Sequence, residues 1–230
     1  MEEPEELLLD TTTRIQTILL IENSNSMKES FDLLKAKVSL IINYLKSDDA
    51  TSQAFAELAV IDYGKNAEVI EPFKGIKEYK RLKLISDVTE DSYNLNKGLA
   101  KAIELSLERK EFYKENGLQF FQPLFFVLLT HDPDDKEYCF FVNNFFNNHS
   151  YRNKGSLIFL YVGNESLKQK LEEIYPNGYF INLESFDEKN ISEIYESATF
   201  ISSDIVLPPD SNKETVKLDE DVNGWLDADV

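Results

Sequence analysis

The sequence predicts a doubly wound α/β fold: a mostly parallel central sheet with one antiparallel edge strand and helices on both faces. Two nearly continuous apolar runs, at 15–21 and 123–130, are typical of strands buried on both faces. Segments with helical spacing of apolar residues alternate with strand-like runs, which is the pattern of parallel strands joined by crossover helices. A short turn at Gly64-Lys65-Asn66 joins two further strand-like segments, so that pair should be antiparallel.

The elements of the N-terminal half are marked by periodicity and by start and stop signals. Apolar residues three and four positions apart indicate helices, whereas continuous or alternating apolar runs indicate strands. Ser24-Asn25-Ser26 provides a turn and a cap for the first helix, and Asn116-Gly117 ends the second. The predicted elements are a strand at 15–21, a helix at 28–46, strands at 55–62 and 67–73, and a helix at 95–115.

The C-terminal half continues the alternation with shorter elements. The run at 123–130 is the strongest buried strand of the chain, and a polar turn at 131–135 ends it. In a doubly wound sheet, ligands bind at the carboxyl ends of the strands, where the strand order reverses. We therefore expect function in the loops at 22–28, 86–95, 131–136 and 163–166. The further elements are a Phe- and Asn-rich helix at 136–148, a strand at 156–162, a helix at 167–174, a strand at 179–183 and a helix at 188–200.

Acidic residues concentrate at the two ends of the chain. The 230 residues include 42 acidic and 24 basic side chains, which gives a net charge of −18. Residues 1–13 hold five acidic and no basic side chains, and residues 203–230 hold eight acidic and two basic ones. Most of the excess charge therefore lies outside the body of the chain. We divide the chain into an acidic N-terminal segment (1–13), one α/β domain (14–202) and an acidic C-terminal tail (203–230).

Charge, cysteine content and hydropathy exclude several classes of protein. An acidic protein repels the phosphates of nucleic acids and of anionic lipids, so we expect neither a nucleic acid nor a membrane as partner. The single cysteine, Cys139, excludes an internal disulfide and a cysteine-based zinc site. The acidic start lacks the positive charge of a signal peptide, and no apolar run reaches the ~20 residues of a membrane span. We expect a cytoplasmic protein.

Four short motifs, in order along the chain, resemble those of the von Willebrand factor type A (vWA) domain. Glu22-Asn23-Ser24-Asn25-Ser26 follows a buried strand and resembles the Asp-x-Ser-x-Ser metal motif of that family. Residues 59–70 resemble its edge hairpin, 95–103 its Leu-x-x-Gly/Ala-Leu helix start, and 128–135 its Leu-Leu-Thr-Asp-Gly-x-Pro turn. The resemblance is to bacterial stand-alone vWA proteins, in particular the tellurite-resistance-associated type. It implies a Rossmann-like sheet and a role in protein–protein interaction.

The resemblance also implies a metal-ion-dependent adhesion site in which several residues have changed. In the family, serine and threonine hydroxyls and aspartates surround a magnesium ion, a hard cation that prefers octahedral oxygen ligands. Ser24 and Ser26 match the family motif, but Glu22 stands where the family has the first aspartate. Tyr93 aligns with the threonine and His131 with the third-loop aspartate, and neither replaces the oxygen ligand that it displaces. The site is therefore expected to be degenerate.

Two interpretations stay open for these residues. Without a metal, Ser24 and Ser26 cap the first helix and bond the neighbouring loop, while Glu22 bonds their hydroxyls or pairs with a nearby cation. With a metal, Glu22, Ser24 and Ser26 hold magnesium or another divalent cation, or His131 holds zinc together with Glu22 and Asp132. We expect no other cofactor. The rim that a partner would contact comprises Asn25, Tyr93, Asn94, His131 and Asp132.

The sequence shows no enzyme signature. Cys139 lies in an apolar helical stretch typical of a core cysteine, pairing of Cys139 with either histidine is not favoured, and no glycine-rich phosphate loop is present. We therefore expect a non-catalytic adaptor or scaffold that binds another protein or a second copy of this chain. By resemblance, its setting is a bacterial stress-response or conflict system. The competing hypotheses are metal-dependent partner binding and an enzyme or nucleotide-binding protein on the same fold.

Overall fold

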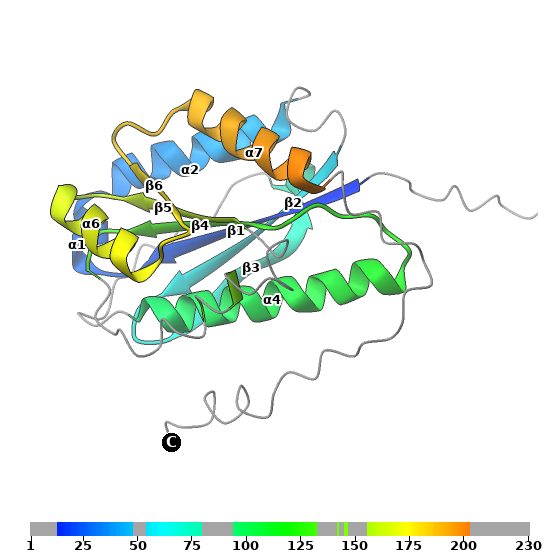
Figure 1. The fold of residues 1–230 in the computed structure, drawn as a ribbon, viewed down its shortest axis with the longest axis horizontal. Coiled ribbons are helices and arrows are strands. Elements are labelled where there is room, and N and C mark those ends of the chain that lie inside the picture. Colours follow the sequence, from blue (N-terminus) through cyan, green and yellow to red (C-terminus); the bar gives the residue numbers. More distant parts are fainter. Residues whose placement is uncertain are drawn as a thin grey trace, which may run out of the picture.

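Six strands form one sheet in the order β3-β2-β1-β4-β5-β6 (Figure 1). The computed structural model describes residues 13–47, 54–79, 94–132, 142, 145–146 and 156–202. Neighbouring strands are parallel except at the β2–β3 edge, where they are antiparallel. This arrangement confirms the predicted fold class. The strands are β1 (Thr13–Glu22), β2 (Ala54–Tyr63), β3 (Ala67–Gly75), β4 (Leu124–Leu129), β5 (Ser156–Tyr161) and β6 (Tyr179–Asn182).

Helices cover both faces of this sheet. Figure 1 shows α2 and α7 on one face and α4 on the other, with α1 and α6 near the end at which the parallel strands terminate. No helix of the described residues is both long enough and apolar enough to cross a membrane. The helices are α1 (Asn25–Glu29), α2 (Phe31–Lys46), α4 (Leu95–Glu115), α6 (Glu165–Ile174) and α7 (Glu188–Ser202), with a 3-10 turn η1 (Ile76–Glu78).

The first helical segment differs from the prediction. We predicted one helix at 28–46, whereas the structure has a short α1 that begins at Asn25 and a separate α2. The backbone N–H of Ser30 donates to the carbonyl of Met27, three residues back, which tightens the turn and separates the two helices. Apart from Val142 and 145–146, the predicted helix at 136–148 lies outside the described residues, as do residues 1–12 and the tail at 203–230.

The alternation of side chains along β1 creates two apolar layers. Ile15, Leu19 and Ile21 point to the layer that α2 and α7 cover. Ile18 and Leu20 point to the opposite layer, which α4 and α6 cover. All five are at most 5% exposed. Because both faces of this central strand are buried, its apolar run is continuous, and this explains why the sequence identified it so clearly.

Two polar residues of β1 attach helices to the sheet. The hydroxyl of Thr17 lies 2.6 Å from the hydroxyl of Tyr195 on α7. The hydroxyl of Ser106 on α4 donates to Oε1 of Gln16 over 2.7 Å. Buried polar groups need such partners, and each bond also fixes the position of a helix along the strand.

A buried ion pair fixes α4 against β2. Nε and Nη2 of Arg109 donate to the two carboxylate oxygens of Glu57, each over 2.7 Å, and the hydroxyl of Tyr113 donates to the same carboxylate over 2.5 Å. The Glu57 side chain is only 6% exposed. Burial, together with the neighbouring carboxylate, raises the pKa of Tyr113 above its ordinary value. The phenol therefore remains a proton donor, and the carboxylate keeps all three hydrogen bonds.

We predict that Arg109→Ala lowers the free energy of unfolding by about 3 kcal/mol, because it leaves the Glu57 carboxylate buried without its cation. Urea denaturation measures this loss. Glu111→Ala is the matched control: Glu111 forms an exposed pair with Lys114 on the same helix, so its loss should change stability by less than about 0.5 kcal/mol. Equal losses in the two variants would contradict the role given to the buried pair.

Candidate functional site

The candidate site lies at the carboxyl ends of β1 and β4. These neighbouring strands pair in parallel, with Ile21 opposite Leu128. β2 lies on one side of β1 and β4 lies on the other. The strand order therefore reverses between β1 and β4. The segments that follow the two strands, 22–26 and 130–132, therefore meet at the place where doubly wound sheets bind ligands.

The carboxylate of Glu22 is the centre of a hydrogen-bond network at this edge. Its side chain is 0% exposed. Oε2 accepts the backbone N–H groups of Thr130, over 2.6 Å, and of His131, over 3.3 Å. Oε1 accepts the hydroxyl of Thr130 over 2.8 Å and the hydroxyl of Ser24. Both oxygens are thus satisfied by protein donors, which is what a carboxylate needs in order to be buried.

Ser24 connects this carboxylate to the start of α1. Its oxygen accepts the backbone N–H of Met27 over 3.1 Å, while its hydroxyl donates to Glu22. The predicted capping role of Ser24 is confirmed, as is the predicted bond between its hydroxyl and Glu22. For Ser26 the predicted cap and the predicted bond to Glu22 are wrong, whereas the predicted bond to the neighbouring loop is confirmed. Ser26 is the second residue of α1 rather than its cap, and its side chain bonds to His131.

His131 lies between Glu22 and Ser26. Nδ1 of its ring lies 2.5 Å from Oε1 of Glu22, and Nε2 lies 3.0 Å from the hydroxyl oxygen of Ser26. Because a carboxylate accepts hydrogen bonds, Nδ1 carries the proton of that contact; a ring protonated at Nδ1 alone then accepts the hydroxyl proton of Ser26 at Nε2. The His131 side chain is 34% exposed, so one edge of this otherwise buried network reaches the surface.

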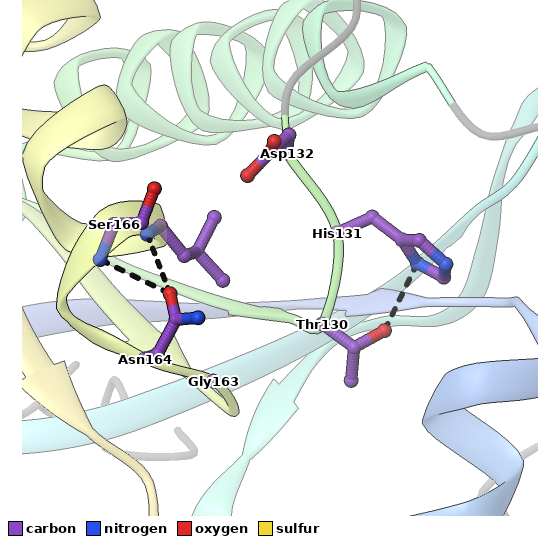
Figure 2. Close-up of a pocket in the computed structure, with 7 residues that line it drawn as sticks. Thr130, His131, Asp132, Gly163, Asn164 and Ser166 are labelled. Atoms are coloured by element: carbon purple, nitrogen blue, oxygen red, sulfur yellow. Dashed lines mark hydrogen bonds between the residues drawn. The ribbon is translucent and has the colours of Figure 1, made fainter.

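Asp132 points to a different part of the rim. Its carboxylate pairs with Lys170 of α6. A cavity of about 480 Å³ lies there, between the end of β4 and the start of α6. Figure 2 shows the His131 ring on the opposite side of the 130–132 turn from Asn164 and Ser166. Asn164 caps α6 by accepting the backbone N–H groups of Ser166 and Leu167. The cavity lining comprises Thr130, His131, Asp132, Gly163, Asn164, Ser166 and Leu167.

The remaining rim residues are placed less centrally. Asn25 is exposed on α1, beside Ser26. Asn94 caps α4, since its side chain accepts the backbone N–H of Lys97 over 2.9 Å, and its own backbone N–H donates to Gly64. Tyr93 lies outside the described residues. The structure therefore brings Asn25, His131 and Asp132 to one edge and gives Asn94 a capping role.

These residues do not fit a divalent cation in this arrangement. The Glu22 oxygens face hydroxyl and N–H donors, whereas magnesium needs oxygen lone pairs directed at it. The proposed zinc set is not assembled either, because Asp132 pairs with Lys170 rather than joining Glu22 and His131. Within the part of the chain that the structure describes, no group of three His, Cys, Asp or Glu residues is placed to hold a metal.

Sequence reasoning missed two residues of this edge, Thr130 and Lys170. Thr130 donates twice to Glu22, and Lys170 neutralises Asp132. The position of Thr130 at the end of the strongest buried strand was a usable signal. It becomes informative only once β4 is known to lie beside β1. Nothing in the sequence pairs Lys170 with Asp132, because 38 residues separate them.

A second polar pair, Asn23 and Asp62, lies beside the site at the ends of β1 and β2. Nδ2 of Asn23 donates to Oδ2 of Asp62 over 2.8 Å. The Oδ1 atoms of both residues are buried and find no hydrogen-bond partner among the described residues. Burial raises the pKa of Asp62 to about 6, although the Asn23 hydrogen bond acts in the opposite direction. The carboxylate is thus under-satisfied, in contrast to that of Glu22.

Comparisons by sequence identify no relative: no protein-family model and no curated protein matches this chain. Comparisons of structure do find similar folds. Proximal thread matrix protein 1 from the mussel byssus, with a zinc-occupied MIDAS motif, has a TM-score of 0.52 at 12% identity. The match covers 83% of this chain and 47% of that one.

Two bacterial surface proteins have similar folds as well. The pilus adhesin SpaC from Lactobacillus rhamnosus GG has a TM-score of 0.56 at 7% identity, covering 81% of this chain and 30% of that one. The D319A mutant of the minor pilin PilB from Streptococcus sanguinis has a TM-score of 0.52 at 12% identity, covering 87% and 65%. This chain therefore spans less than two thirds of each of these three chains. At these identities the likeness shows the fold, and it confirms the vWA-like architecture.

We predict that Asp62→Asn stabilises the protein at pH 7 by about 1 kcal/mol. This is less than the full pKa shift of Asp62 would give, because solvent screens a partly exposed carboxylate. The folded chain holds the Asp62 proton between about pH 4 and pH 6, whereas the unfolded chain releases it. Stability should therefore fall as the pH rises through this window, and the variant should lose that dependence. Urea denaturation at several pH values measures it. Asp32→Asn, at an exposed position on α2, should keep the native pH dependence, and a native profile in Asp62→Asn would contradict the assignment.

We also predict that Glu22→Gln lowers the free energy of unfolding by about 2 kcal/mol, because an amide group then meets donors that need an acceptor. Thermal and urea denaturation provide the measurement. Glu165→Gln is the control, since the Glu165 side chain is exposed on α6, and it should change stability by less than about 0.5 kcal/mol. A Glu22 variant as stable as this control would show that the network contributes little.

Proposed function

We propose that this domain is a protein-binding module that contacts its partner through the rim at the carboxyl ends of β1 and β4. The observation that carries this proposal is the Glu22 network, which holds the two rim segments 22–26 and 130–132 in one arrangement. A surface that is already ordered loses less entropy when it binds, and it therefore binds more tightly for the same contacts. Asn25 and His131 are the polar groups that this rim presents.

The proposed binding mode does not use a metal ion. Protein donors already satisfy the buried carboxylate of Glu22, so the rim keeps its shape without a cation. The partner would then be recognised by hydrogen bonds to exposed side chains and by the cavity beside α6, which has room for a side chain of the partner. No turnover is needed for this role, and we propose an adaptor or scaffold.

The similar structures support a binding role. One is a matrix protein of the mussel byssus and another is a pilus adhesin, both named for roles in assembly or attachment. For this chain, we propose a cytoplasmic setting, which its single cysteine favours, and, by the motif resemblance, a bacterial stress-response or conflict system. A second copy of the chain is the simplest alternative to a different protein as partner.

We predict that a photo-crosslinking residue at Asn25 captures one specific partner in cells that express the chain naturally. The same residue at Lys189 is the matched control: its side chain is 80% exposed at the start of α7, which follows the edge strand β6, separated from β1 by β4 and β5. Mass spectrometry identifies the adducts. Capture at Lys189 but not at Asn25 would contradict the proposed surface, and a product of twice the chain mass would identify self-association.

The same experiment separates this proposal from metal-dependent binding. That alternative draws its support from the zinc-occupied motif of the mussel protein, which shares the fold. We expect crosslinking at Asn25 to be unchanged after treatment with a chelator. If the adduct disappears with the chelator and returns with zinc or magnesium, metal-dependent binding is the correct function.

A further inference from the structure

Three side chains of the site form a continuous carboxylate–imidazole–hydroxyl chain. Oε1 of Glu22 lies 2.5 Å from Nδ1 of His131, and Nε2 of the same ring lies 3.0 Å from the hydroxyl oxygen of Ser26. The order of groups is that of a serine nucleophile, its general base and the acid that orients the base. We propose that Ser26 is an activated nucleophile that reacts with small carboxylic esters. This reactivity goes beyond partner binding and does not depend on it.

The surroundings of Glu22 suit the orienting role. A carboxylate in this role must stay fixed and must accept the hydrogen bond of Nδ1–H, so that Nε2 is the ring atom that takes a proton. Here two backbone N–H groups and two hydroxyls, from Thr130, His131 and Ser24, hold the carboxylate in place. Its complete burial prevents water from competing for the imidazole. Glu22 is therefore a positioning residue.

Ser26 and His131 are both reachable from solvent. Ser26 is partly exposed on α1, and the His131 side chain is 34% exposed. A nucleophile that is hydrogen-bonded to an accessible base meets the nucleophile–base part of the geometric requirement for acyl transfer. By contrast, the Ser24 hydroxyl is buried and donates to Glu22, so it is not placed to react.

The proposed reaction balances with water as the second reactant. Oγ of Ser26 attacks the ester carbon, and its proton passes to Nε2 of His131. The bond to the leaving alkoxide then breaks, and the alkoxide takes that proton to become an alcohol, which leaves an acyl ester on Ser26. Water attacks this ester with the same help from His131, which releases the carboxylic acid and restores the hydroxyl. An activated ester is the best probe, because its leaving group needs the least stabilisation.

The test is to incubate the full chain with p-nitrophenyl acetate and, separately, with a fluorophosphonate probe. We expect release of p-nitrophenol from the ester, and one lasting adduct per chain from the fluorophosphonate, located on Ser26 by peptide mass spectrometry. Ser26→Ala should abolish the adduct, and His131→Gln should slow its formation at least about 100-fold. Ser192→Ala is the control. Ser192 donates to Glu196 on the surface of α7, so its loss should not change the rate of adduct formation.

The role of Glu22 needs a readout that stability does not affect. Proton NMR should show a far-downfield resonance from the Nδ1 proton of His131, which Glu22→Gln removes and Ser26→Ala keeps. The substitution Glu22→Gln should also slow acylation at a temperature at which the variant is fully folded. The proposal is overturned if no adduct forms, if adducts map to other residues, or if Ser26→Ala reacts as fast as the native chain.

Discussion

The need to satisfy one buried carboxylate organises the whole edge of this domain. Glu22 ends the central strand, and its side chain is 0% exposed. Its oxygens draw together the start of α1, through Ser24, and the turn after β4, through Thr130 and His131. Loss of any of these donors would leave a buried charge poorly compensated. The loops at the site are therefore fixed by the same bonds that allow Glu22 to be buried.

The sheet supplies the rigidity that this network requires. β1 lies between β2 and β4, and both of its faces are covered by apolar layers. Polar bonds from Gln16 and Thr17 then hold α4 and α7 at defined positions along the strand. Apolar burial is non-directional, so it stabilises the layers without fixing their register. The directional bonds fix the positions of these helices along β1, and the site at the end of β1 is therefore built on a rigid strand.

One arrangement of side chains thus supports two separable properties. The ordered rim favours partner binding, because its loops are already held in place. The contact of His131 with Ser26 favours nucleophilic reactivity, because a base lies against a hydroxyl. Both proposed properties rest on the hydrogen bonds around one buried carboxylate. Glu22 and His131 take part in both, because their contact links the rim segments and orients the imidazole toward Ser26.

Local patterns were sufficient to predict the strands, most helices and the antiparallel hairpin. The apolar run of β1 and the helical spacing of α4 depend on neighbours in sequence, so periodicity reveals them. Capping by Ser24 was equally local. The pairings of Glu22 with His131 and of Asp132 with Lys170 were not, because they join residues 109 and 38 positions apart. Only the strand order β1–β4–β5 and the placement of α6 bring these groups together, and no local pattern encodes such distances. The same reason explains why Ser26 looked like a cap in the sequence and became the partner of His131 in the fold.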